Sequence, residues 1–533
     1  MNQKNIPFGL SSIFFITIIV AFCSIVYELL LAQTLTVILG GNVVRYSITI
    51  GLYLFFLGIG ALSCEKPKEY PLKTFILLEI ILSITGAFSV VILFYLSTFQ
   101  FSHPYFFLFI SHAMIAWIGF LSGMEIPLLT QILGGNKFAR ILGFDYFGSL
   151  IGTIVFALYL HSELGLVTSS FVIATLNLFV AIACLIKSDF KLLKVFSVIL
   201  LIIFSVVLYF SQNIQNYLRF FYQNSYISSL VPNSKIRITN VIQTKYQTIT
   251  EGHGEVFNKE GVSFFKDHFI FLDKGLQLGT TWFKPYHQAF ATGGLLYQNK
   301  PKLDILILGG GDLLLAQDLL GSGRVKHIDL VDIDQEFINY LKVHPYYSRY
   351  NQYAHSSKNV KIHVKDAFLW VRKKAILQKS KYDLIFIDFA SLKESDKGLH
   401  LYSQEFFTWC NQLLNSNGAM LSWVYDSKNH KKIMTNLFFE SNFKYKKEYK
   451  AYTMKHLKEV SYSPDIDNTF VQTFWILSKS DISNFKNLRG FSSYQKLLYK
   501  TVLNESWITL KANNKKVNSI FKPNYNLIVS NKK

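Results

Sequence analysis

The chain has 533 residues, of which 50% are hydrophobic and 16% aromatic, and it carries a formal net charge of +20. This composition excludes a purely soluble protein, and the length allows two or three domains. Lysine-rich cytoplasmic loops beside an anionic leaflet explain the basic excess, so in the absence of an aromatic-basic motif we expect no nucleic-acid partner. The cysteines are scattered without C-x-x-C spacing, which favours neither a disulfide framework nor a metal site: Cys23, Cys64, Cys184 and Cys410.

The first 212 residues predict a multi-pass helical bundle in a membrane. About seven apolar stretches have spanning length: Leu10–Leu31, Tyr46–Leu62, Phe75–Tyr95, Phe106–Ile126, Ile141–Leu160, Leu166–Ile186 and Leu193–Phe210. The first stretch follows a single Lys4, is too long for a signal-peptide core and lacks a clear cleavage site, so we expect it to be retained.

Ionisable residues inside these stretches allow two interpretations. The residues are Glu28, Glu79, Glu125 and Asp145. Because an ionisable group in hydrocarbon costs several kcal/mol unless it is paired or faces water, they either pair with Arg45, Arg140 or backbone groups, or serve a transport or substrate pathway. Pro127 frees a carbonyl beside Glu125, which keeps the second interpretation open.

Loop charges predict the orientation of the bundle. Lysine and arginine gather in the even-numbered loops, which are therefore expected to be cytoplasmic. With seven spans the N-terminus would lie inside and the chain after Phe210 outside, although the nucleoside substrate inferred below is cytosolic. One miscounted span would remove the conflict, so the side of the soluble part stays open.

A polar stretch, 212–225, is expected to be the linker to a soluble part made of residues 213–298 and 299–533. Ile236–Thr250 and Phe264–Leu278 alternate like strands around a glycine-rich turn at Gly252–Gly254, which predicts a small β-sheet. Residues 299–533 are expected to form an α/β domain with a C-terminal extension.

That α/β domain opens with a strand, a glycine-rich loop, a helix and a second strand. Leu303–Leu308 is apolar, Gly309, Gly310 and Gly311 permit a sharp turn, Leu313–Leu320 suits a short helix, and His327–Val331 suits a strand. Asp332 follows about 20 residues after the loop, where such folds keep an acid for ribose hydroxyls. Leu314 stands where a dinucleotide fingerprint needs glycine, so a sulfonium nucleoside of the adenosylmethionine kind fits better than a nicotinamide.

Four acids occupy comparable positions in this domain. Asp312 lies in the glycine loop, and Asp332, Asp366 and Asp388 each follow a predicted strand, where an open parallel sheet places its ligand. The last two strands are Val360–Val364 and Tyr382–Ile387; the helix Glu405–Leu414 and the strand Ala419–Val424 come later. Asp366 can equally be a helix N-cap. The set of four favours a ligand site.

Short segments along nearly the whole chain resemble the spermidine/spermine synthases, or polyamine aminopropyltransferases, in particular their multi-pass membrane branch. In the first half they are Ile25–Leu29, Ser47–Gly51, Gly123–Pro127 and Asp145–Gly148. In the second half they are Tyr246–Gln247, Leu272–Gln277, Tyr286–His287, Gly309–Asp312, Asp332–Asp334, Asp366–Ala367 and Leu401–Phe406.

The resemblance implies roles for these positions. The glycine loop, with Gln247, Gln277 and Asp312, would hold the aminopropyl side of the donor. Asp332 would hold its ribose and Asp366, beside Ala367, its adenine amine. Asp388 would be the catalytic residue at the attacking amine, and the acceptor pocket would be lined by Tyr286, His287 and Ser391. Carboxylates suit a polycationic amine and the hydroxyl and amino donors of adenosine.

Three positions depart from the family pattern. Leu313 replaces a usual glycine and would approach the donor, Ser391 replaces a second acceptor-binding acid, and Gln288 replaces a usual glutamate. The resemblance implies a membrane-bound transferase that moves an aminopropyl group from decarboxylated S-adenosylmethionine, a co-substrate, to an amine such as putrescine, with no other cofactor. A methyltransferase and a catalytically degenerate polyamine or nucleoside sensor are the alternatives. Residence in the inner cell membrane is expected, and a homo-oligomer is left open.

Overall fold

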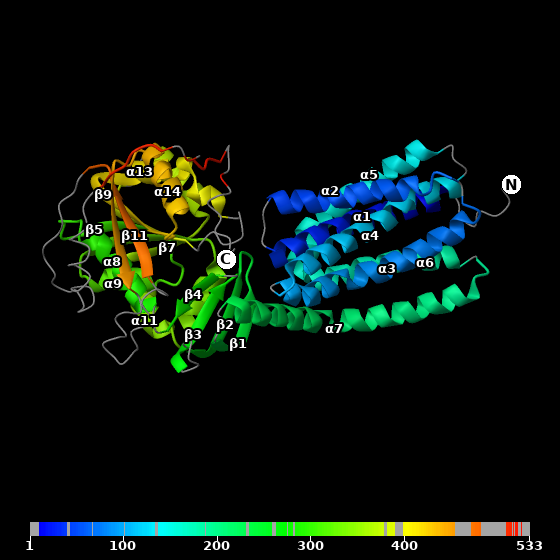
Figure 1. Cartoon of the computed structure of the whole chain (residues 1–533), viewed down its shortest axis with the longest axis horizontal. Coiled ribbons are helices and arrows are strands. Elements are labelled where there is room, and N and C mark those ends of the chain that lie inside the picture. Colours follow the sequence, from blue (N-terminus) through cyan, green and yellow to red (C-terminus); the bar gives the residue numbers. More distant parts are fainter. Residues whose placement is uncertain are drawn as a thin grey trace. The chain divides into compact units, whose positions relative to one another are not determined.

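The computed structural model divides into two compact units, Met1–Leu230 and Val231–Lys533, which are described separately (Figure 1). The residues it describes are 10–39, 43–66, 68–100, 102–133, 137–186, 188–230, 234–257, 263–273, 275–280, 283–377, 381–389, 398–452, 471–480, 508–513, 515, 517–520 and 524.

The first unit is entirely helical. Its helices are α1 (Leu10–Leu39), α2 (Val43–Leu62), α3 (Pro71–Leu96), the 3₁₀ turn η1 (Ser97–Gln100), α4 (Pro104–Ile132), α5 (Phe138–Val155), the π-helical η2 (Phe156–Leu164), α6 (Gly165–Leu185) and α7 (Lys191–Leu230). All seven expected apolar stretches coincide with helical segments.

Six helical stretches of this unit are long and apolar enough to cross a membrane, judged by length and composition alone. The fifth, Phe138–Leu185, has 48 residues, or about 72 Å at 1.5 Å per residue, far more than one crossing needs. Gly165, with a φ of 78°, interrupts it. The stretch therefore contains two helices, α5 and α6, which reconciles six stretches with the seven expected from the sequence.

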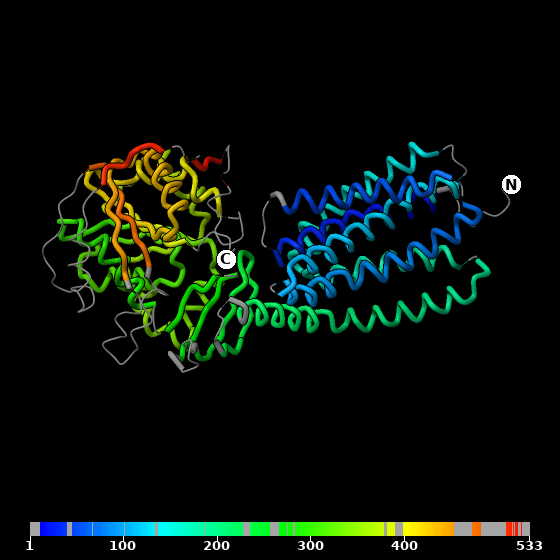
Figure 2. The backbone as a smooth tube through the Cα atoms, viewed as in Figure 1, coloured from blue at the N-terminus to red at the C-terminus, as the bar shows by residue number. Residues whose placement is uncertain are grey.

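The expected linker at 212–225 is wrong, because α7 continues through it to Leu230 (Figure 2). Leu218, Tyr222 and Tyr226 are buried at intervals of four residues, which places them on one helical face. The Tyr222 hydroxyl donates to the Ile38 carbonyl oxygen at 3.2 Å, tying α7 to the end of α1. Polar residues on the opposite face masked this periodicity.

Two acids of the helical unit are fully enclosed. Glu79 is 0% exposed and Glu125 2% exposed. Neither pairs with a basic side chain within the described part of the chain, so the expected pairing with Arg45 or Arg140 is wrong for these two. Gly123 lies against the Leu57 carbonyl and Gly60 against that of Phe120, where a β-carbon would collide. These glycines allow α2 and α4 to pack closely.

The second unit begins with a four-stranded antiparallel sheet in the order β1-β2-β3-β4. The strands are β1 (Ser234–Gln243), β2 (Thr248–Phe257), β3 (Ser263–Leu272) and β4 (Gly275–Gly279). The small β-sheet is confirmed, but the turn expected at Gly252–Gly254 is wrong, because both glycines lie inside β2. A β-carbon on Gly254 would collide with the Lys235 carbonyl, so the glycine serves close strand approach instead. The turn is at residues 244–247, where Thr244 N donates to Gln247 O at 2.9 Å.

An eight-stranded sheet follows, in the order β12-β10-β11-β9-β8-β5-β6-β7. Its strands are β5 (Leu303–Gly309), β6 (Val325–Asp332), β7 (Val360–Val364), β8 (Tyr382–Asp388), β9 (Leu414–Val424), β10 (Tyr445–Tyr452), β11 (Val471–Ser478) and β12 (Ile508–Thr509). Strands β9, β8, β5, β6 and β7 are parallel, and β10 and β11 are antiparallel.

Helices cover both faces of this sheet. They are α8 (Phe283–Leu295), α9 (Leu314–Gly321), α10 (Gln335–Val343), α11 (Ser348–Ser356), α12 (Ala367–Leu377), the turn η3 (Leu399–Tyr402), α13 (Gln404–Leu413) and α14 (Lys428–Glu440). Along β5, Ile305 and Ile307 pack with α8 and α9, whereas Leu306 and Leu308 pack with α12, α13 and α14. This alternation explains why the strand reads as continuously apolar, and the expected Rossmann-like fold is confirmed.

Candidate functional site

The glycine loop wraps over the ends of two parallel strands. Gly309 and Gly310 adopt φ values of 84° and 69°, in the left-handed region that favours glycine. Gly310 N donates to the Asp388 backbone oxygen at 3.2 Å, and a β-carbon on Gly309 would collide with that oxygen. The predicted donor-binding glycines therefore contact the end of β8 at Asp388, the predicted catalytic residue.

Leu313 does not project from this loop. Its φ is 60° and its side chain is fully buried in the core beneath α8 and α9. The predicted approach of Leu313 to the donor is therefore wrong. A left-handed conformation costs a leucine about 1–2 kcal/mol, and burial of its side chain offsets that cost.

Asp332 ends β6 and faces the glycine loop. Its Oδ2 accepts from Gly311 N and its Oδ1 from Asp334 N, both at 2.9 Å. A β-carbon on Gly311 would lie 2.8 Å from Oδ2, so only glycine permits this approach. Burial raises the pKa of Asp332 to about 6, although the two backbone donors oppose the shift. The position is the one expected for the acid that holds a ribose.

If Asp332 holds a ribose, as the sequence predicts, its raised pKa makes nucleoside binding depend on pH. Ribose hydroxyls donate, so the ionised form of Asp332 should bind better than the protonated form. Since the pKa is about 6, affinity for methylthioadenosine should fall about tenfold from pH 7.5 to pH 5, as one unit below a pKa leaves about a tenth ionised. Calorimetric titration across this range tests the prediction, and Asp332→Asn should flatten the profile. A wild-type affinity independent of pH would contradict it.

Three buried acceptors meet beside the loop. His287 on α8, Asp312 in the loop and Asp388 at the end of β8 place one ligand atom each within 4.8 Å of one another. His287 Nδ1 donates to the Phe283 carbonyl at 2.7 Å, which leaves the lone pair of Nε2 facing Asp312 Oδ2 at 3.7 Å. The Tyr286 hydroxyl donates to Asp388 Oδ1 at 3.4 Å.

Burial sets the charge state of this cluster. It raises the pKa of Asp388 well above its usual range, and the neighbouring Asp312 raises it further. Burial also lowers the pKa of His287, so the imidazole is neutral. Among the described residues, no lysine or arginine pairs with this cluster. Such a group of acceptors suits a ligand that brings several N–H donors and a positive charge, as a protonated amine does.

The other predicted residues have contacts of their own. Gln247 Nε2 donates to Asp334 Oδ2 at 2.9 Å, and Gln277 lies in β4 at a register shift. Asp366 Oδ1 accepts from Leu369 N at 3.1 Å and so also caps α12, next to the buried Ala367. Ser391 lies outside the described residues. Asp312 Oδ1 accepts from Leu314 N at 2.9 Å, which leaves Oδ2 toward His287.

Two residues were not assigned roles from the sequence. Asp334 caps α10 and accepts from Thr244 Oγ1 at 2.7 Å, joining the β1–β2 turn to the α/β core. The sequence signal for this role was the position of Asp334 between a strand pattern and a helix pattern, where N-cap residues occur. Tyr402 is buried, and its pKa is raised by burial and then by Asp388, which places it near the catalytic candidate. Only tertiary structure shows that proximity.

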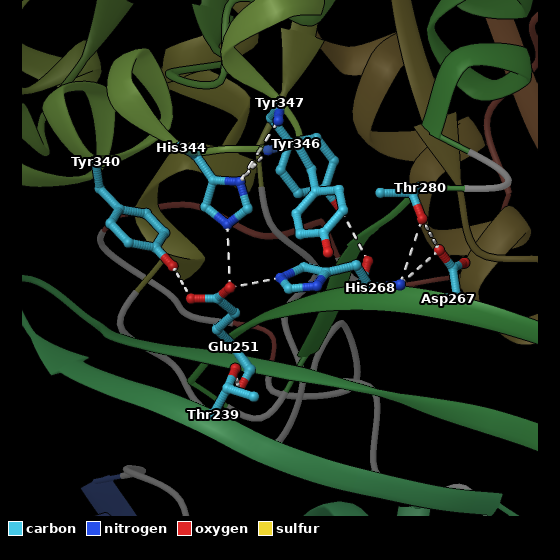
Figure 3. A network of polar contacts seen from close by, with 9 residues as sticks. All are labelled: Thr239, Glu251, Asp267, His268, Thr280, Tyr340, His344, Tyr346 and Tyr347. Atoms are coloured by element: carbon cyan, nitrogen blue, oxygen red, sulfur yellow. Dashed lines mark hydrogen bonds and ion pairs between the residues drawn. The ribbon is translucent and has the colours of Figure 1, made fainter.

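A second cluster joins β2 and β3 to the end of α10 (Figure 3). Glu251 Oε1 lies 2.5 Å from His268 Nε2 and 3.3 Å from His344 Nε2. Two imidazoles and a carboxylate are a common metal-ligand set. His344 Nδ1, however, accepts from the backbone N–H groups of Tyr346 and Tyr347 at 3.2 and 3.4 Å. Because Nδ1 accepts, the ring proton of His344 is on Nε2, which faces Glu251. A nitrogen that carries a proton cannot bind a metal, so the geometry favours a polar contact network over a metal site.

The parallel sheet, its glycine loop and the acceptor-lined edge define a Rossmann-like α/β domain. Residues 283–463 match the spermine/spermidine synthase domain. Among similar proteins, a polyamine aminopropyltransferase of Leptospira interrogans is 28% identical over 77% of this chain and 78% of its own. Polyamine aminopropyltransferase 2 of Aquifex aeolicus is 26% identical over 94% of this chain and 95% of its own. The chain is therefore similar to polyamine aminopropyltransferases over most of its length, as its sequence segments suggested.

Proposed function

We propose that this protein transfers the aminopropyl group of decarboxylated S-adenosylmethionine to an amine such as putrescine, giving spermidine or a related polyamine and methylthioadenosine. The observation that carries the proposal is the buried group of His287, Asp312 and Asp388, next to Asp332. A reaction between an amine and a sulfonium nucleoside requires a pocket for a cation next to an acid that can hold a nucleoside.

The donor would lie across the carboxyl edge of the sheet. Asp332 would hold the ribose hydroxyls, and Asp366 the adenine amine at the adjacent strand. Asp312, with Gln247 and Gln277, would hold the amino end of the transferred group. Register supports this order, because Asp332 pairs with Val364 in the parallel sheet, two residues before Asp366.

The reaction is a displacement at carbon. The acceptor nitrogen forms a bond to the methylene carbon attached to sulfur, the carbon–sulfur bond breaks, and its electron pair neutralises the sulfonium. An amine has a pKa near 10 in water and an ordinary aspartate about 4, so proton transfer between them is unfavourable. Burial raises the pKa of Asp388 and disfavours a second cation near the sulfonium. Asp388 would orient the amine and accept its proton as attack proceeds.

A product assay tests the proposal. Purified protein is given decarboxylated S-adenosylmethionine or S-adenosylmethionine, together with a panel of amines, and the products are identified by mass spectrometry. We expect methylthioadenosine and a lengthened amine from the decarboxylated donor alone. Methylated products from S-adenosylmethionine would support a methyltransferase, and binding without turnover would support a sensor.

We also propose that the six apolar helical stretches anchor the enzyme in the inner cell membrane, with the lysine-bearing even loops cytoplasmic. Cysteines introduced at Lys66 and Lys191 should then resist an impermeant thiol label in intact cells. Labelling of both from outside would contradict the placement. A cysteine at Ser225 would report the side on which the end of α7 lies.

A further inference from the structure

We propose that Glu251 is a positioning residue for the donor nucleoside: it holds α10 against the small β-sheet, and α10 in turn holds Asp332. The inference rests on the proposed function only for its ligand, methylthioadenosine. Glu251 touches neither the glycine loop nor the acid cluster in the described contacts, so it would act entirely through α10.

The carboxylate of Glu251 contacts three side chains from two parts of the fold, β3 and the C-terminal half of α10 (Figure 3). Oε1 accepts from His268 Nε2 of β3 at 2.5 Å and lies 3.3 Å from His344 Nε2, at the C-terminal end of α10. Oε2 accepts from the Tyr340 hydroxyl of α10 at 2.5 Å. The hydrogen bond from His268, together with the nearby His344, holds the pKa of Glu251 far below its usual range, so it is ionised. The charge is therefore part of the contact.

The same sheet also holds the other end of α10. Asp334, the N-cap of the helix, accepts from Thr244 Oγ1 and Gln247 Nε2 of the β1–β2 turn. Polar contacts thus fasten α10 at its first and its last turn, and the strand β2, which carries Glu251, directly follows the β1–β2 turn. A helix held at both ends cannot pivot freely about either one.

The orientation of Asp332 depends on this helix. Asp334 N donates to Asp332 Oδ1 at 2.9 Å, and Ile338 of α10 packs in the core near Gly311, whose own N–H donates to Asp332 Oδ2. If the last turn of α10 were released, the first turn of the helix would also be free to move. The hydrogen bond from Asp334 N to Asp332 would then change its geometry. The expected consequence is weaker donor binding with the acceptor pocket unchanged.

The test compares Glu251→Gln with Glu255→Gln in the full-length protein. Both residues lie on β2, but Glu255 makes an ion pair with the exposed Lys266 and serves as the matched control. Glutamine keeps the shape of Glu251 but offers one acceptor oxygen and no charge to His268, Tyr340 and His344. We expect affinity for methylthioadenosine, measured by calorimetry, to fall about tenfold in Glu251→Gln and to stay within twofold in Glu255→Gln.

Kinetics separate positioning from simple loss of folded protein. We expect the KM for the donor to rise about tenfold in Glu251→Gln, with kcat and the KM for the amine nearly unchanged, because damaged folding would lower kcat instead.

Should Glu251→Gln fail to fold, Tyr340→Phe removes one hydrogen-bond donor to Glu251 and should weaken affinity for methylthioadenosine about threefold. Unchanged affinity in both variants, with binding retained by wild type, would overturn the inference. Stoichiometric Co²⁺ binding that Glu251→Gln abolishes would also overturn it. No binding by wild type would refute the proposed function instead.

Discussion

Replacing Asp388 with asparagine is expected to lower kcat for aminopropyl transfer by at least about a hundredfold, while affinity for the donor stays nearly unchanged. General base assistance contributes about 10²–10⁴-fold in rate, and asparagine keeps the shape of the side chain but cannot take a proton. Asp388 is the acid whose pKa burial and Asp312 raise most clearly toward that of an amine. Single-turnover kinetics and calorimetric titration of methylthioadenosine measure the two quantities separately.

The matched control for Asp388→Asn is Asp304→Asn. Asp304 lies near the start of β5 in the same sheet, away from the carboxyl ends of the strands, and pairs with the exposed Lys326. The control should retain wild-type kcat. Near-normal transfer by Asp388→Asn would remove this residue from the mechanism. If wild type itself transferred nothing to any amine, the sensing alternative would replace the enzyme.

Replacing Asp332 or Asp366 with alanine is expected to weaken nucleoside binding without unfolding the domain. Each charge-assisted hydrogen bond contributes about 1.5–3 kcal/mol, which corresponds to a loss of about 10–150-fold in affinity for methylthioadenosine. Asp332 should show the larger effect, because it is more enclosed and already accepts from two backbone N–H groups. Calorimetry gives the affinities, and circular dichroism reports whether the fold persists.

Asp366 also caps α12 through Leu369 N, so its alanine variant should additionally lose about 1 kcal/mol of stability. Asp366→Asn separates the two effects, since asparagine is an equally good cap but lacks the charge. If Asp366→Asn bound the nucleoside normally and Asp366→Ala did not, the role of Asp366 would be restricted to capping α12. Unchanged affinity in both Asp332→Ala and Asp366→Ala would reject the donor assignment.

The amino-acid sequence by itself determined the parts of this protein that depend on local pattern. Apolar length predicted the helices of the first unit, because a membrane-spanning helix needs about 20 apolar residues in a row. The run from Leu303 to Asp332 predicted strand, loop, helix and strand, because Gly309 and Gly310 need left-handed angles and the strands are buried on both faces. Asp332 was identified from its spacing after that loop.

Tertiary structure alone decided what depends on packing between distant segments. Leu313 turns into the core because its neighbours on α8 and α9 leave an apolar space for it, and local sequence cannot show that space. Gly254 allows β2 to approach the Lys235 carbonyl of β1 closely. In the sequence alone, a glycine at this position is also typical of a turn. Burial raises the pKa of Asp388, and Asp312, 76 positions earlier in the chain, raises it further. Glu251 meets Tyr340 and His344 only because β2 and α10 pack together; charge in a protein is set by neighbours in space, which spacing along the chain does not reveal.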